Sequence, residues 1–141
     1  RGRQSVGGDT KVRQKQITPT SLFTLSVSEV ISIISDRVLN DIPEGINGEE
    51  DVVQLERLLG RLPNDYAYVI ELLSHARSYV RYLKRQKLKE EYEDMMDKRD
   101  ALESIANALK LQYQGVSRMI TTYEQRREEN NMHEYRKDPR S

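Results

Sequence analysis

Apolar residues recur at helical spacing along successive stretches of this sequence. The first stretch opens with Ser26 and Glu29, which form an S-x-x-E capping box at a helix start. Behind the cap, the apolar positions follow the i, i+3, i+4, i+7 spacing of one buried helix face. They are Val27, Val30, Ile31, Ile34 and Val38. The pattern predicts a helix that ends at residues 41–45, where Asp, Pro and Gly favour a turn.

A second, shorter helix is predicted from about Glu49 to Leu62. Its first turn is acidic, which suits the positive N-terminal end of a helix dipole. Leucines and valines continue at helical spacing to Leu62. Pro63 should end the helix, because a residue before proline is pushed out of the α region.

The dominant pattern follows Pro63, after which no Gly or Pro occurs until Gly115. Steps of three and four define a first heptad seam. Its positions are Tyr66, Val69, Leu73, Ala76, Val80 and Leu83. The next position at this spacing is Lys87, which is not apolar. A second seam starts one residue later, at Leu88. Its positions are Leu88, Tyr92, Met95, Arg99, Leu102, Ala106, Leu109, Tyr113, Val116, Ile120 and Tyr123.

Two structures are compatible with this one-residue offset between the two heptad seams. One is a single bent helix of about 90 Å. The other is a hairpin that turns near residues 84–100, with Asp100 and Glu103 starting its second arm. We expect a largely continuous helix, because the region lacks a glycine.

These patterns predict an all-α fold with two short helices followed by a long heptad-patterned helix or helical hairpin. Residues 1–20 form a flexible basic arm and residues 21–62 a short helical region. Residues 63–127 form the long coiled-coil-like helix or hairpin, and residues 128–141 form a polar tail. The first sixteen residues are too polar to compensate for the entropy of ordering them.

The long region also predicts self-association. A second apolar stripe, at Tyr68, Leu72, His75, Tyr79 and Tyr82, lies beside the first seam. A helix that is apolar on more than one side needs more than one partner. We therefore expect a homo-oligomer or a larger protein assembly. The candidate oligomer seam comprises Leu88, Tyr92, Met95, Leu102, Leu109, Tyr113, Val116 and Ile120.

Composition argues against an enzyme. The chain has no Cys and two His, so a Cys-based zinc site or nucleophile is excluded. His75 suits a half-buried structural position better than a catalytic one. The acidic run of residues 90–97 suits a solvated helix face that pairs with Lys87, Lys89, Lys98 and Arg99. We expect no catalytic residue, cofactor, metal, small-molecule substrate or membrane span, and a location in the cytoplasm or, for a phage protein, the host cytoplasm or virion.

Charge patterning supplies the main functional candidate. The 23 basic and 23 acidic residues cancel overall, yet four cations fall at i, i+4, i+7 and i+8 with tyrosines interleaved. Such a stretch can neutralise phosphates and stack on unpaired bases. The candidate nucleic-acid-binding residues are Arg77, Tyr79, Arg81, Tyr82, Lys84, Arg85, Lys87 and Lys89. The alternative is a solvated charged face whose tyrosines pack in an oligomer.

Two segments resemble a known family. Ala101–Ile105 through Lys110, followed by Val116–Ile120, is similar to the C-terminal helical pattern of phage recombination mediators. The resemblance implies a small helical protein that forms rings, binds single-stranded DNA and helps to load a recombinase. We therefore expect a non-enzymatic, nucleic-acid-binding accessory factor of recombination or replication. The alternative is a structural subunit of a large assembly, such as a phage capsid, neck or tail component, or a coiled-coil adaptor.

Overall fold

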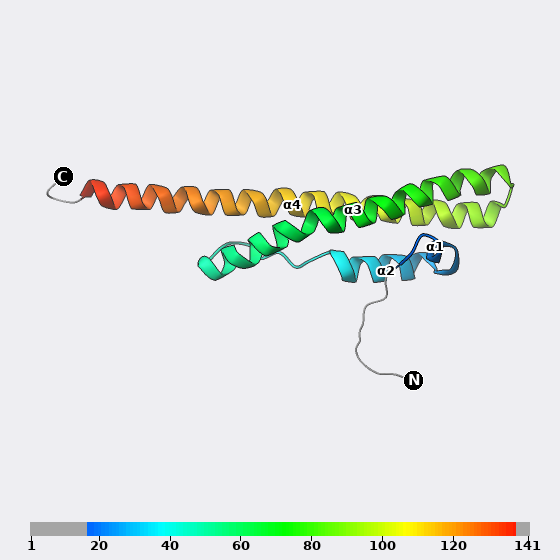
Figure 1. Ribbon diagram of the computed structural model, residues 1–141, viewed down its shortest axis with the longest axis horizontal. Helices are drawn as coiled ribbons and strands as arrows, with labels where there is room; N and C mark the ends of the chain where they lie inside the picture. The colour runs from blue at the N-terminus through cyan, green and yellow to red at the C-terminus, as the bar shows by residue number, and fades with distance from the viewer. Residues whose placement is uncertain (1–16, 138–141) are drawn as a thin grey trace, which may run out of the picture.

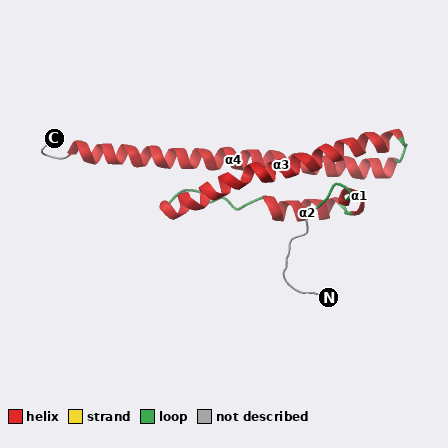
Figure 2. Ribbon diagram, viewed as in Figure 1, coloured by secondary structure: helices red, strands yellow, loops and turns green. Residues whose placement is uncertain are grey.

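The fold is a long helical hairpin with two short helices along one side. The computed structural model describes residues 17–137, with side chains up to Met132. Its elements are α1 (Ser21–Thr24), α2 (Val27–Val38), α3 (Glu49–Arg85) and α4 (Lys89–Lys137), as Figure 1 shows. The described residues contain helices and loops only, which confirms the all-α prediction (Figure 2). The expected arm of residues 1–16 and residues 138–141 lie outside the described residues.

The predicted start of α2 is confirmed by its capping box. The Ser26 N–H donates to Glu29 Oε1 (2.8 Å), and the Glu29 N–H donates to Ser26 Oγ (3.1 Å). These bonds satisfy two donors that a helix start leaves without partners. The predicted apolar face is confirmed at Val30, Ile34 and Val38, which are fully buried. Val27 is half-buried, and Ile31 is 42% exposed, so its predicted burial was wrong.

The ordered fold begins earlier than the boundary predicted at residue 20. Ile17 is only 3% exposed, and its N–H donates to the Tyr68 hydroxyl (3.1 Å). That hydroxyl in turn donates to the Ile17 carbonyl (3.2 Å). Residues 17–20 therefore belong to the packed structure.

A buried lysine fastens α1 to α4. Lys98 has a side chain that is 1% exposed, and its Nζ donates to the Leu22 carbonyl (2.6 Å). Its charge is balanced by Asp94, 2.5 Å away and one turn earlier. The Leu22 carbonyl needs this donor because α1 is a single turn, in which the Leu25 N–H donates to the Ser21 carbonyl instead. The expectation that Lys98 lies on a solvated face was wrong.

The predicted helix break at Pro63 was also wrong, because α3 continues through this residue for 37 residues in all. A proline inside a helix loses one backbone hydrogen bond and costs about 3 kcal/mol. Leu62 and Val69 are buried on either side of it, and Pro63 itself is exposed. Burial along both flanks therefore outweighs the local cost.

The chain reverses at residues 86–88, so the hairpin is correct and the favoured continuous helix was wrong. Lys87 has a φ of 59°, the left-handed conformation that glycine usually supplies. The Leu88 N–H donates to the Leu83 carbonyl (3.2 Å) and the Lys87 N–H to the Lys84 carbonyl (3.1 Å). These two bonds form a Schellman motif, which ends α3 without a glycine. The second arm starts at Lys89, and Asp100 lies well inside α4.

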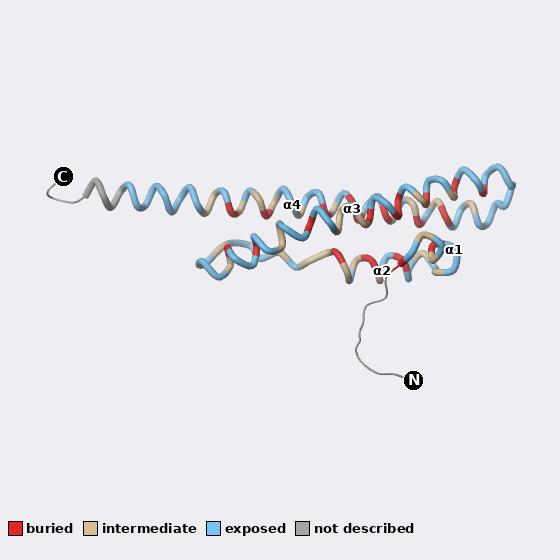
Figure 3. The backbone as a smooth tube through the Cα atoms, viewed as in Figure 1, coloured by how far each residue is buried: buried red, intermediate tan, exposed pale blue. Residues whose placement is uncertain are grey.

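The hairpin buries the two predicted seams against each other, as Figure 3 shows by the red positions where α3 and α4 run together. Of the first seam, only Tyr66 is half-buried and the other five positions are buried. Six of the eleven positions of the second seam are buried too. Tyr92, Arg99 and Tyr123 are half-buried, and Leu88 and Tyr113 are exposed. A chain that folds back can therefore cover both stripes by itself.

The loop of residues 39–48 fills the space between the start of α3 and α4. Ile42 and Ile46 pack against a second core cluster of Leu55, Val116 and Ile120. Asn40 ties three elements together: its Nδ2 donates to the Val38 carbonyl, and its oxygens accept from Arg61 of α3 and Gln112 of α4. The loop thus fixes α2 relative to both arms.

The turn at Lys87 generates a stability prediction. Lys87→Gly should raise the free energy of unfolding by about 1 kcal/mol, because glycine removes the strain of a left-handed side chain. Urea unfolding followed by circular dichroism measures the change. Gln86→Gly is the matched control, and it should lower stability by about 0.5–1 kcal/mol because Gln86 has an ordinary right-handed conformation. A destabilised Lys87→Gly protein would indicate a continuous helix at this position.

The buried lysine generates a second prediction. Asp94→Asn should lower the free energy of unfolding by about 1–2 kcal/mol, since the Lys98 ammonium would lose its charged partner. Asp97→Asn is the control, because Asp97 is exposed on the same helix and has no ion pair among the described residues. The same urea titration compares them. Equal stability of the two variants would show that the Lys98–Asp94 pair contributes nothing.

Candidate nucleic-acid interface

The α3–α4 hairpin has one face covered by α1 and α2 and one face free of them. On the covered face, Lys98 reaches Leu22, and the Phe23 ring contacts the Tyr79 ring with centroids 4.4 Å apart. On the other side, Arg77 of α3 forms an ion pair with Glu103 of α4 (3.2 Å). We call the side marked by this ion pair the open face.

Three of the four predicted cations within α3 lie toward the open face, and Tyr79 does not. Successive helix residues are rotated by about 100°. Arg77, Arg81 and Lys84 therefore fall within an arc of about 60°, whereas Tyr79 is rotated from Arg77 by about 200°. The contact of Tyr79 with Phe23 agrees with this geometry. Tyr79 lies between Arg77 and Arg81 in the sequence, but its side chain is therefore not beside theirs on the helix.

The remaining candidate residues cluster at the tip of the hairpin. Tyr82 and Arg85 lie in the last turn of α3, Lys87 in the reversal, and Lys89 at the start of α4. All four are exposed, Tyr82 by 48%. Within the described part of the chain, the side chains of Lys84, Arg85, Lys87 and Lys89 have no ion pair.

Residues of α4 complete the open face, and sequence reasoning missed them as candidate binders. Tyr92, Arg99 and Lys110 share the helical direction of Glu103, because they are separated from it by 4, 7 or 11 residues. Arg99 is paired with Asp100 (3.0 Å), and the Lys110 side chain is exposed. Only the register of the hairpin, given by the Arg77–Glu103 pair, puts these residues beside the cations of α3.

Part of the acidic run at the start of α4 lies on the covered face. Glu90, Glu91 and Asp94 line a hollow of about 290 Å³ together with Phe23 of α1. The ion pairs expected between this run and nearby cations occur only at Asp94–Lys98 among the described residues. Three of the five acidic side chains of this run therefore lie on the face opposite Arg77, Arg81 and Lys84.

The candidate oligomer seam is largely used within the chain. Five of its eight residues are buried between helices of the same molecule: Met95, Leu102, Leu109, Val116 and Ile120. Leu88 and Tyr113 are exposed, and Tyr92 is half-buried. The seam therefore no longer argues for self-association.

The second apolar stripe of α3 also finds partners in the same chain. Tyr68 bonds to Ile17, and the Arg37 guanidinium lies over its ring at 4.5 Å. Tyr79 contacts Phe23. The N-terminal segment thus covers the part of the stripe at Tyr68 and Tyr79, whereas Tyr82 at its end stays 48% exposed.

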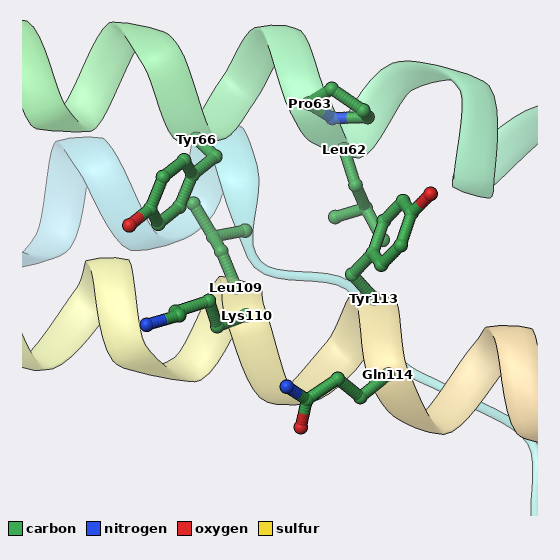
Figure 4. Close-up of a pocket in the computed structure, with 7 residues that line it drawn as sticks. All are labelled: Leu62, Pro63, Tyr66, Leu109, Lys110, Tyr113 and Gln114. Carbon is green, nitrogen blue, oxygen red and sulfur yellow. The ribbon is translucent and has the colours of Figure 1, made fainter.

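A hollow of about 220 Å³ opens on the open face where α3 and α4 diverge (Figure 4). Both helices line it, with α2 on the far side of the hairpin. The lining residues are Leu62, Pro63, Tyr66, Leu109, Lys110, Tyr113 and Gln114. Apolar side chains form its floor, and a lysine and an amide lie at its edge.

The described residues contain no group of three His, Asp or Glu side chains that could hold a metal. His75 is half-buried beside Tyr79, with ring centroids 6.1 Å apart. Within the described range, none of the helices combines the length and the apolar character needed to cross a bilayer. Comparisons with family models, curated proteins and solved structures find no match to this chain.

Proposed function

We propose that this chain is a non-enzymatic accessory protein that binds single-stranded nucleic acid on the open face of its hairpin. The observation that carries the proposal is that exposed cations lie on the open face, whereas nearby acidic side chains lie on the covered face. Arg81, Lys84 and Lys110 are exposed on this face without ion pairs among the described residues, while Glu90, Glu91 and Asp94 of the nearby acidic run line the covered face. A net charge of zero is therefore compatible with a locally basic surface.

The dimensions of the face suit a strand of several nucleotides. Lys84 and Tyr66 are 18 residues apart on α3, which corresponds to about 27 Å along the helix. Cations along such a path neutralise successive phosphates and release their counterions. Arg77 can join them by exchanging Glu103 for a phosphate, because an exposed ion pair of this kind contributes only about 0.2–1 kcal/mol.

Aromatic side chains on the same face favour single strands. Tyr92 is half-buried, and Tyr113 is 42% exposed beside the apolar hollow. Exposed aromatic rings stack on unpaired bases, whose faces are inaccessible within a duplex. The similarity of residues 101–120 to phage recombination mediators points in the same direction and suggests a role in recombination or replication.

A structural subunit is the second candidate, and the end of α4 favours it. Among the side chains that the structure describes, the last ion pair from α4 to another element is Arg127–Glu49, and residues 128–132 are exposed. A polar helix without packing is marginally stable in water and gains order from a neighbour. Mass photometry tests this function: a virion or adaptor subunit should form higher assemblies at micromolar concentration without nucleic acid, and a stable monomer would contradict it.

The charge-sorted face predicts a change in salt dependence. Arg81→Ala/Lys84→Ala should reduce the slope of log binding constant against log salt by about 1.4, since each lost single-strand phosphate contact contributes about 0.7. Fluorescence anisotropy of a labelled oligo(dT), measured between 50 and 200 mM salt, gives the slope.

Arg57→Ala/Arg126→Ala is the matched control for that experiment. It removes the same charge from two exposed cations outside the open face, so the slope should stay at the wild-type value. An equal loss of slope in both double variants would mean that the binding follows total charge only. Absence of any binding at 50 mM salt would refute nucleic-acid binding itself.

A further inference from the structure

The hollow on the open face is an unfilled part of the helix–helix seam. Figure 1 shows α3 and α4 close together at the tip and farther apart toward the start of α3. Near Pro63 the side chains of the two helices leave a hollow of about 220 Å³ that opens to the surface. The floor consists of Leu62 and Leu109, both buried.

Aromatic walls distinguish this hollow from an ordinary apolar groove. Figure 4 shows the rings of Tyr66 and Tyr113 on opposite sides, with Leu62 and Leu109 between them. Tyr66 comes from α3 and Tyr113 from α4, so the hairpin register sets their separation. Two rings around an apolar floor suit a flat aromatic ligand, because such a ligand can stack on a ring and cover the leucines.

Two polar side chains at the rim of the hollow, Lys110 and Gln114, indicate which chemical groups a ligand should carry. Lys110 supplies a cation without an ion pair among the described residues, which suits a phosphate. Gln114 supplies an amide that can both donate and accept hydrogen bonds, as the edge of a nucleobase requires. A purely apolar protein segment would leave both groups without a matching partner.

The hollow is continuous with the cations of the open face. Tyr66 and Arg77 are 11 residues apart, which is about 16 Å along α3 with a rotation of only about 20°. A strand that follows Lys84, Arg81 and Arg77 toward the start of α3 therefore arrives at the hollow. The nearby charge thus favours a polyanion with aromatic groups.

We propose that this hollow binds one unpaired nucleobase between Tyr66 and Tyr113, while Lys110 contacts an adjacent phosphate. The inference rests on the proposed function and names the subsite that makes the open face selective for single strands. It assigns base stacking to Tyr113, which was expected in an oligomer seam, and not to Tyr79, which is covered by Phe23.

The test compares oligo(dT) with an abasic oligonucleotide of equal length, in which every sugar lacks its base. Fluorescence anisotropy gives the affinity of each for the full-length wild-type protein and its variants. Wild type should bind oligo(dT) more tightly than the abasic strand by about tenfold or more, since one stacked base contributes about that factor. Tyr113→Leu should lose about tenfold on oligo(dT) and keep its affinity for the abasic strand.

Two control variants isolate the aromatic ring. Tyr113→Phe keeps the ring and should retain the preference for oligo(dT), whereas Tyr113→Leu keeps only apolar volume. Leu111→Ala truncates an exposed apolar residue on the same helix, outside the hollow, and should change neither affinity. Tyr113 is itself exposed, so each variant should unfold at a urea concentration close to that of wild type.

The outcomes separate the inference from the function on which it rests. Salt-dependent binding of both strands with equal affinity would overturn the base pocket and leave binding to the phosphate backbone intact. Failure of wild type to bind either strand at 50 mM salt would overturn the proposed function. If Tyr113→Leu altered the assembly mass of the protein alone and kept the oligo(dT) preference, the hollow would be a protein contact and the inference would be wrong.

Discussion

The reversal at residues 86–88 is the constraint on which the rest of the structure depends. Each arm of the hairpin has an apolar seam that is unstable in water, and residues 17–137 contain no other helix long enough to cover it. Folding back within three residues lets α3 and α4 bury each other. The left-handed conformation of Lys87 makes this possible, at a cost far below the gain from the buried side chains.

The closed hairpin then determines where charge can accumulate. Once α3 and α4 are paired, α1 and α2 pack along one side, where Lys98 holds the Leu22 carbonyl. Glu90, Glu91 and Asp94 at the start of α4 fall on that side. Arg77, Arg81 and Lys84 of α3 fall toward the open face because helical rotation carries them away from Tyr79. A neutral chain thereby acquires one basic surface.

Local signals in the sequence were enough for part of the fold. The Ser26–Glu29 box predicted the start of α2, and the spacing of apolar residues predicted most of the buried positions. The break at Pro63 and the continuous helix through Lys87 were wrong for the same reason. Both predictions relied on local conformational preference, and packing across the hairpin outweighs a preference of about 1–3 kcal/mol.

The candidate site was predictable only where it depends on a single helix. The spacing of Arg77, Arg81 and Lys84 identifies one face from sequence alone. Which aromatic residues join that face depends on the register between α3 and α4 and on the position of Phe23. These are long-range contacts, and no local pattern encodes them. The same limitation hid the burial of Lys98, which resembles any surface lysine one turn after an aspartate.

Photo-crosslinking tests the central claim, the division of the hairpin into a covered and a nucleic-acid-binding face, most directly. An oligonucleotide containing 5-iodouracil would be irradiated in complex with the full-length protein, and the modified residues identified by mass spectrometry. Crosslinks should concentrate on Tyr66, Tyr92 and Tyr113 of the open face. Crosslinks concentrated on Tyr68 or Tyr79 of the covered face would contradict the account.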